Sequence, residues 1–153
     1  GLFVGPSSPV NSTSLFHVVG SSATIDLKWH FSSGPRATLR FTLDPGGVSP
    51  IQMRNAHPSD FAKVDGSTID MEFESESVRD TLVALPPGDA GRVFNLVGAT
   101  GSTFSANWLY ANLTLAAGDD ADWVLQDDGV TWLQARFITE PPPPPSGMLF
   151  FVK

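Results

Sequence analysis

Short segments that alternate apolar and polar residues recur along this 153-residue chain, and Gly- or Pro-rich turns separate them. In the clearest segment, Ile25, Leu27, Trp29 and Phe31 alternate with polar residues. A period of two is typical of a β-strand with one buried face. No segment shows the longer apolar period of a 12-residue helix. We therefore expect an all-β fold, an antiparallel β-sandwich or jelly-roll-like barrel with at most one or two short helical turns.

The strand signals also suggest local pairing. Residues 25–31 and 37–43 both alternate, and the turn at 32–35 between them predicts an antiparallel hairpin. The apolar run at 81–85 predicts another strand, ended by Pro86-Pro87. Ser59 can cap a single helical turn over residues 58–64.

Composition divides the chain into three parts. Residues 1–14 are rich in Gly, Pro, Ser and Asn and predict a hinge or N-terminal arm, whereas residues 15–140 carry the strands of the β-sandwich domain. Residues 141–153 begin with five prolines, a stiff spacer, and end with the strand-like run MLFFV. We expect this run to dock on the N-terminal Leu2-Phe3-Val4 or on a neighbouring subunit, since exposing it to water is costly.

Charge and composition exclude several classes of function. The net charge is −7 with nine basic residues, which argues against binding to nucleic acid. No apolar run approaches the length needed to cross a bilayer, so we expect no membrane insertion, and we also expect no secretory leader. The chain has no cysteine, so cysteine chemistry and cysteine-bound metals are absent.

No catalytic signature is present, and we expect a protein that is not an enzyme. Three separated histidines fit no metal or catalytic spacing, and serine occurs without a nucleophile-elbow motif. Carboxylates alternate from Asp70 to Glu76, which places them on a solvated strand face. We expect no obligatory cofactor. The acidic loop with Asp119, Asp120 and Asp122 predicts either a Ca²⁺ site or an unoccupied loop.

Aromatic residues are dense between residues 103 and 139. In the strand predicted over 104–115, Trp108, Tyr110 and Asn112 share the face opposite an aliphatic one. Asp128-Gly129 predicts a tight hairpin that pairs Leu125 with Trp132 and Trp123 with Gln134. Exposed rings beside amides favour a sugar platform or a subunit interface, and packing in the core is the alternative. The candidates for ligand or interface contacts are therefore Trp108, Tyr110, Asn112, Trp123 and Trp132.

In general style the chain resembles a protruding domain from the capsid protein of a small icosahedral RNA virus of the nodavirus or tetravirus type. The resemblance rests on the arm GPSSPVNSTS, the cysteine-free and Ser/Thr-rich strands, and the acidic loop GDDAD. It implies a β-sandwich at the virion surface that forms dimers or trimers and attaches to a host receptor or glycan. The arm up to Ser14 would then be the hinge to the shell.

Two other classes remain open. A carbohydrate-binding module of a larger enzyme would show coplanar, exposed Trp and Tyr rings and would be extracellular. A phage tail or head-decoration domain would assemble through an apolar end.

Overall fold

The computed structural model describes residues 2–4, 13–27, 30–54, 61–64, 66–100, 112–129 and 131–143. These residues form three β-sheets and one α-helix. Sheet A contains β1 (Leu2–Val4), β4 (His30–Ser33) and β7 (Phe61–Lys63). Sheet B has the order β10 (Thr114–Leu115), β8 (Thr68–Phe73), β5 (Ala37–Leu43), β2 (Ser14–Val19). Sheet C has the order β11 (Trp123–Asp127), β12 (Trp132–Phe137), β9 (Val93–Thr100), β6 (Ile51–Arg54), β3 (Ile25–Leu27).

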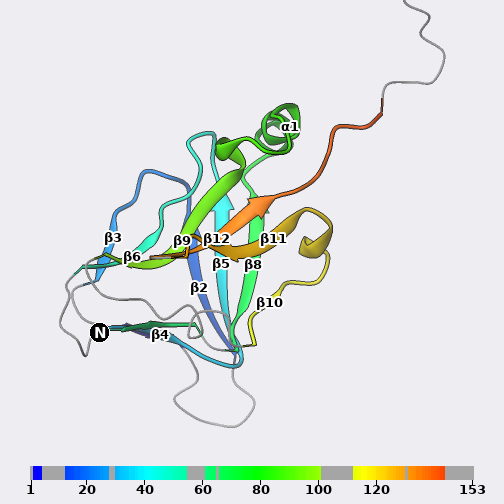
Figure 1. Ribbon diagram of the computed structural model, residues 1–153. Helices are drawn as coiled ribbons and strands as arrows, with labels where there is room; N and C mark the ends of the chain where they lie inside the picture. The colour runs from blue at the N-terminus through cyan, green and yellow to red at the C-terminus, as the bar shows by residue number, and fades with distance from the viewer. Residues whose placement is uncertain are drawn as a thin grey trace, which may run out of the picture.

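The chain visits sheets A, B and C in turn, three times over. The first coil is β1, β2 and β3, the second is β4, β5 and β6, and the third is β7, β8 and β9. Equivalent strands of successive coils pair in parallel in every sheet. Figure 1 shows β2, β5 and β8 side by side as one such stack. This winding is that of a short parallel β-helix, in which each coil contacts its neighbours.

The expectation of an antiparallel sandwich or jelly-roll-like barrel is therefore wrong. Residues 25–31 and 37–43 do not form the expected hairpin, because β3, β4 and β5 belong to three different sheets. The turn between β4 and β5 is a corner of the coil, where Arg36 adopts a left-handed backbone with φ of 73°. Its carbonyl accepts a hydrogen bond from the Ser14 amide at 3.1 Å, which joins the corner to the first coil.

The core consists of apolar side chains stacked from coil to coil. In sheet B the register aligns Phe16, Leu39, Ile69 and Leu115. In sheet C it aligns Ile25, Ile51, Val97 and Leu133. The middle members of both stacks are fully buried. Since complete burial of such a side chain contributes about 1.5–3 kcal/mol, these stacks supply much of the driving force that holds the coils together.

Helix α1 (Glu76–Ala84) is inserted between β8 and β9. It begins after the extended N-cap Ser75 and ends at Leu85, just before two prolines. Val78 and Leu82, four residues apart, bury one face of the helix. The strand expected at 81–85 is wrong, because the short apolar run belongs to this helical face.

Two antiparallel strands close sheet C after the third coil. β11 and β12 form the hairpin predicted around Asp128-Gly129, but Trp123 pairs with Phe137 and Leu125 with Ala135. The expected register is therefore wrong. The connection is longer than a two-residue turn, since β11 ends at Asp127 and β12 begins at Trp132. The Asp128 carboxylate accepts hydrogen bonds from the amides of Thr131 and Trp132 at 2.6 and 2.8 Å.

Several remaining predictions lie partly outside the described residues. Phe61–Lys63 form β7, so the helical turn expected over 58–64 is wrong there. Leu2–Val4 form β1, and residues 5–12 of the predicted arm and 144–153 of the predicted C-terminal strand are outside the described ranges. After β12 the described chain leads away from the sheets (Figure 1). Within the described ranges, no helix has the length and apolar character to span a membrane.

Candidate functional site

The outer face of sheet B carries a polar network that links the three coils. His17 Nε2 lies 2.8 Å from Thr42 Oγ1, and this hydroxyl donates to Glu72 Oε2 at 3.2 Å. Arg40 bonds Asp70 Oδ2 at 2.7 Å and Glu72 Oε1 at 3.0 Å. The Asp70 and Glu72 carboxylates of β8 therefore have partners on the neighbouring strand β5. Thr42 is 9% exposed and its hydroxyl is already a donor, so this His–Thr–Glu chain offers no free nucleophile.

The acidic loop forms the short 3₁₀ helix η2 (Asp119–Ala121), and its carboxylates do not converge. Asp119 Oδ2 accepts the Met71 amide at 2.8 Å. Asp122 Oδ1 accepts Arg79 Nη2 at 3.1 Å and the Thr139 hydroxyl. Asp120 is exposed. Within the described ranges, no group of three or more His, Asp or Glu side chains is placed to hold a metal ion.

The pKa values of Asp119 and Asp122 in this loop are shifted in opposite directions. Burial raises the pKa of Asp119, and the nearby acidic Asp70 and Asp122 add to the effect. Burial also acts to raise the pKa of Asp122, but hydrogen bonds from Thr139 and Arg79, together with the Arg79 charge, outweigh it. The pKa of Asp122 is therefore held below its ordinary value. Asp122 stabilises the contact between η2 and α1, whereas the charge on Asp119 costs stability.

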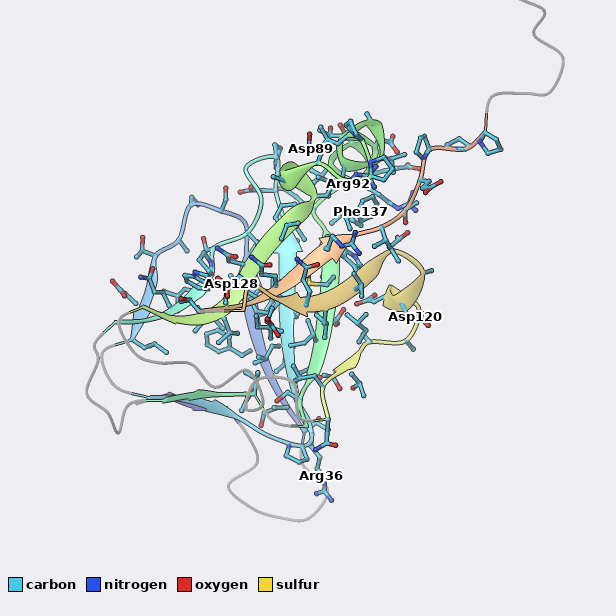
Figure 2. All side chains as sticks on the ribbon, in the orientation of Figure 1. Arg36, Asp89, Arg92, Asp120, Asp128 and Phe137 are labelled. Atoms are coloured by element: carbon cyan, nitrogen blue, oxygen red, sulfur yellow. The ribbon has the colours of Figure 1, made fainter. Side chains whose placement is uncertain are left out.

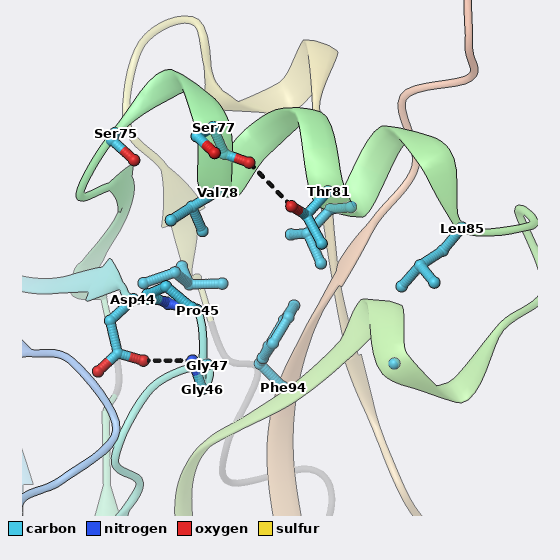
Figure 3. Close-up of a pocket in the computed structure, with 13 residues that line it drawn as sticks. Asp44, Pro45, Gly46, Gly47, Ser75, Ser77, Val78, Thr81, Leu85 and Phe94 are labelled. Atoms are coloured by element: carbon cyan, nitrogen blue, oxygen red, sulfur yellow. Dashed lines mark hydrogen bonds between the residues drawn. The ribbon is translucent and has the colours of Figure 1, made fainter.

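A pocket of about 380 Å³ lies between α1, β9 and the turn at Asp44–Gly47 (Figure 3). Its apolar lining comes from Leu43, Pro45, Val78, Leu82, Leu85 and Phe94. Its polar lining comes from Ser75, Ser77, Thr81 and Asp44, and the Thr81 hydroxyl already donates to the Ser77 carbonyl at 2.9 Å. Asp44 already accepts bonds from Ser21 and from the Gly46 amide, and these hold its pKa below the ordinary value. The pocket therefore offers an apolar floor and neutral hydroxyls to a ligand.

A shallower cleft of about 430 Å³ lies between β8, α1 and η2. Glu72, Glu76, Asp119 and Asp122 line it together with Arg79. Arg79 is paired with Asp122. The cleft is acidic overall and suits neither a phosphate nor a nucleic acid backbone.

The aromatic candidates from the sequence have different surroundings. Trp123 is 2% exposed and packs on Phe73, Phe94 and Phe137 with ring centroids 5.2–5.9 Å apart, so it belongs to the core and presents no ring to solvent. Trp132 is half-buried and covers Gly98 of the neighbouring strand. Asn112 is exposed in a turn with φ of 63°. Trp108 and Tyr110 lie outside the described residues.

Arg92 was not among the residues predicted from the sequence, and it is fully buried near the end of α1 (Figure 2). Its guanidinium donates to the carbonyls of Thr139 at 2.8 Å, Val83 at 3.2 Å and Leu85. A lone arginine between a Pro/Gly-rich turn and a strand carries no sequence signal for burial. The geometry assigns it a structural role, tying the C-terminal end of α1 to the end of β12.

The surface of β2 was also not among the sites predicted from the sequence. Among the described residues this strand is an edge of sheet B, and its Leu15 and Val19 side chains are 56% and 59% exposed. Residues 15–19 are apolar apart from His17, and this composition does not show which side chains face solvent. β1 and β3, of the same coil, are also edge strands of their sheets among the described residues. Within the part of the chain that the structure describes, the first coil thus presents the strand edges of all three sheets at one end of the β-helix.

Comparison of the chain with protein-family models, with curated proteins and with solved structures found no match.

Proposed function

We propose that this chain is a non-enzymatic domain of a virus particle surface that associates with copies of itself and contributes to attachment to a host receptor or glycan. The observation that carries the proposal is the open first coil, where edge strands of all three sheets lie together. Exposed edge strands are ready templates for pairing with another chain, and natural proteins usually cover or charge them. The outward side chains of β2 are not charged in this way and include the exposed apolar Leu15 and Val19.

The parallel winding changes what supports this proposal. The resemblance to protruding domains implied an antiparallel sandwich, and that part of its support is gone. The arm composition, the cysteine-free strands and the acidic loop remain. A phage tail or head-decoration domain predicts the same self-association through an apolar end. The virion surface is accordingly the location we propose, with an extracellular location for the carbohydrate-binding alternative.

Self-association is tested by light scattering on the purified chain over a concentration series. We expect a concentration-dependent shift from monomer to a dimer or trimer, because strand pairing at the open coil is non-covalent and follows mass action. A strict monomer up to the highest soluble concentration would count against the proposed function.

A second candidate function, binding of a neutral glycan, is favoured by the pocket between α1 and β9. The Phe94 ring offers an apolar surface to a sugar face, and Ser75, Ser77 and Thr81 offer hydroxyl partners. A volume of about 380 Å³ is enough for a small ligand. In this alternative the chain is a carbohydrate-binding module.

Intrinsic tryptophan fluorescence tests the glycan candidate. The Phe94 ring lies 5.9 Å from the Trp123 ring, so a ligand in the pocket changes the surroundings of Trp123. A glycan panel is expected to give a saturable change that Ser77→Phe abolishes by filling the pocket. Asp80→Phe, on the same helix but away from the pocket lining, is the matched control. A flat response, or an equal loss in both variants, removes this candidate.

A further inference from the structure

The backbone of β2 shows which residues face the open edge of sheet B. The amide of Ser14 donates to Arg36 O at 3.1 Å, and that of Gly20 donates to Thr42 O at 2.9 Å, both towards β5. Because the N–H and C=O groups of alternate residues in a strand point to opposite sides, the even-numbered residues of β2 face β5. The N–H and C=O groups of Leu15, His17 and Val19 therefore face the edge of sheet B that no other described strand covers, called the open edge below.

The side chains of these same three residues lie on the outer face of the sheet. Leu15, His17 and Val19 are all exposed, whereas Val18 between them is buried. No Asp, Glu, Lys or Arg occurs in Ser14–Val19, although the chain has a net charge of −7. The outward sequence apolar–His–apolar is symmetric about His17.

We propose that two copies of the chain pair β2 with β2 in antiparallel fashion, with His17 of both copies on the two-fold axis. This rests on the proposed self-association and names its contact. In this register Leu15 of one copy lies opposite Val19 of the other, and Val19 opposite Leu15. Phe16 lies opposite Val18, so the inner face extends the apolar core across the axis.

The alternating direction of the backbone N–H and C=O groups along β2 supports this register. Leu15, His17 and Val19 all direct their backbone groups outwards, so each opposed pair exchanges two N–H···O=C bonds. A shift of one residue would oppose inward-facing to outward-facing backbone groups and lose these bonds. A two-fold contact brings the same patch of both copies together, so the patch must be complementary to itself. The outward residues of β2 read apolar–His–apolar in both directions and meet this requirement.

Charge also favours a second copy as the occupant. Two copies with a charge of −7 each repel through most of their surfaces. The outward face of β2 carries no carboxylate, so the repulsion is weakest where the strands meet. The apolar Leu15 and Val19 pairs lose contact with water on pairing.

Cysteine cross-linking tests the register, since the chain has no cysteine of its own. In a hydrogen-bonded antiparallel pair the Cα atoms are about 5.5 Å apart, within the range that a disulfide spans. His17→Cys is therefore expected to give a covalent dimer as the main product of mild oxidation. Leu15→Cys, on the same exposed strand, is the matched control and should stay largely uncross-linked by itself. Leu15→Cys mixed with Val19→Cys should cross-link.

Charged substitutions test the surface independently of cysteine chemistry. Leu15→Lys and Val19→Lys each introduce two charges per dimer, and both should weaken the dimer by at least about tenfold, or about 1.4 kcal/mol. Ile138→Lys alters another exposed apolar residue, 37% exposed and distant in sequence, and should leave the dimer unchanged. Circular dichroism melts confirm that the variants fold.

The outcomes separate this inference from the proposed function. A chain that is monomeric at all concentrations overturns both. An oligomer that persists in Leu15→Lys and Val19→Lys, or that gives no His17→Cys cross-link, overturns the β2 contact and leaves self-association standing. A strong Leu15→Cys cross-link indicates parallel in-register pairing and overturns the antiparallel register.

Discussion

The guanidinium carbon of Arg92 lies 5.4 Å from the ring centroid of Phe137, so a buried cation stacks on the aromatic core. The ring of Phe137 in turn packs edge-on against Trp123. Arg92 donates to three backbone carbonyls from the end of α1 and the end of β12, while its Nε has no partner among the described residues. This cation–π contact and its hydrogen bonds help Arg92 to fix α1 to the β-helix.

Arg92→Met should lower the free energy of unfolding by about 2–4 kcal/mol. The substitution keeps much of the apolar stem but leaves the carbonyls of Thr139, Val83 and Leu85 without a donor, and an orphaned buried acceptor costs about 1–3 kcal/mol. Urea denaturation measures the change. Arg136→Met, an exposed arginine on β12, is the control and should stay within about 0.5 kcal/mol of the parent chain. Equal effects of the two substitutions would contradict the role given to Arg92.

Gly98→Ala should destabilise the chain by about 1–3 kcal/mol, the usual cost of overpacking. A Cβ at Gly98 would lie 2.2 Å from Trp132 Cε3, so the indole or the strand must move. Gly88→Ala is the matched control, because a Cβ there meets nothing within 4 Å. Thermal melts of the two variants measure the difference. If Gly98→Ala is as stable as Gly88→Ala, then Trp132 does not cover β9 as described.

The Asp122→Asn substitution should reveal a pH-dependent contribution to stability. Asp122 has a lowered pKa in the folded chain, so its stabilisation is present above about pH 4, the ordinary value, and is lost as the pH falls through the folded value. The loss of stability caused by Asp122→Asn should therefore be largest near pH 7 and shrink below pH 4. Asp120→Asn in the same loop is the control. A difference between Asp122→Asn and the parent chain that does not change between pH 7 and pH 3 would exclude this linkage.

Calcium should not raise the melting temperature through the acidic loop. Asp119 is bound to the Met71 amide and Asp122 to Arg79 and Thr139, so binding of an ion would have to break these contacts. A scan with millimolar CaCl₂ and then EDTA tests this, since a ligand of the folded state raises its stability. A rise of several degrees that EDTA reverses and Asp119→Asn removes would restore the calcium hypothesis.

The local alternation of the sequence predicted where strands occur better than how they pair. β5 and β8 lie in segments expected to be strands. Alternation shows that one face of a strand is buried, but both parallel and antiparallel neighbours satisfy it. The hairpin expected between 25–31 and 37–43 failed for this reason.

No repeat in the sequence indicated the β-helix, and the register explains why. The positions stacked in sheet B are Leu15, Thr38, Thr68 and Thr114, so the length of the coil changes at each step. A β-helix with unequal coils has no fixed period to detect. The insertion of α1 between β8 and β9 adds to this irregularity.

The candidate site was also only partly predictable. Asp119 and Asp122 could be picked out as acidic, but their pairing with Met71 and Arg79 depends on the third coil and on α1. Trp123 was chosen for its aromatic ring, and burial against Phe73, Phe94 and Phe137 became visible only with the fold. The exposure of Leu15 and Val19 depends on β2 being an edge strand, which follows from the pairing that the sequence did not reveal.

Amide hydrogen exchange along β2 tests the open first coil most directly. In dilute protein, the amides of Phe16 and Val18 should be protected by β5, while those of Leu15, His17 and Val19 exchange rapidly. In concentrated protein, the exchange of these odd-numbered amides should slow by at least about tenfold as the edges pair. Odd-numbered amides that are as protected as their neighbours at every concentration, or an absence of alternation, would contradict the open parallel edge.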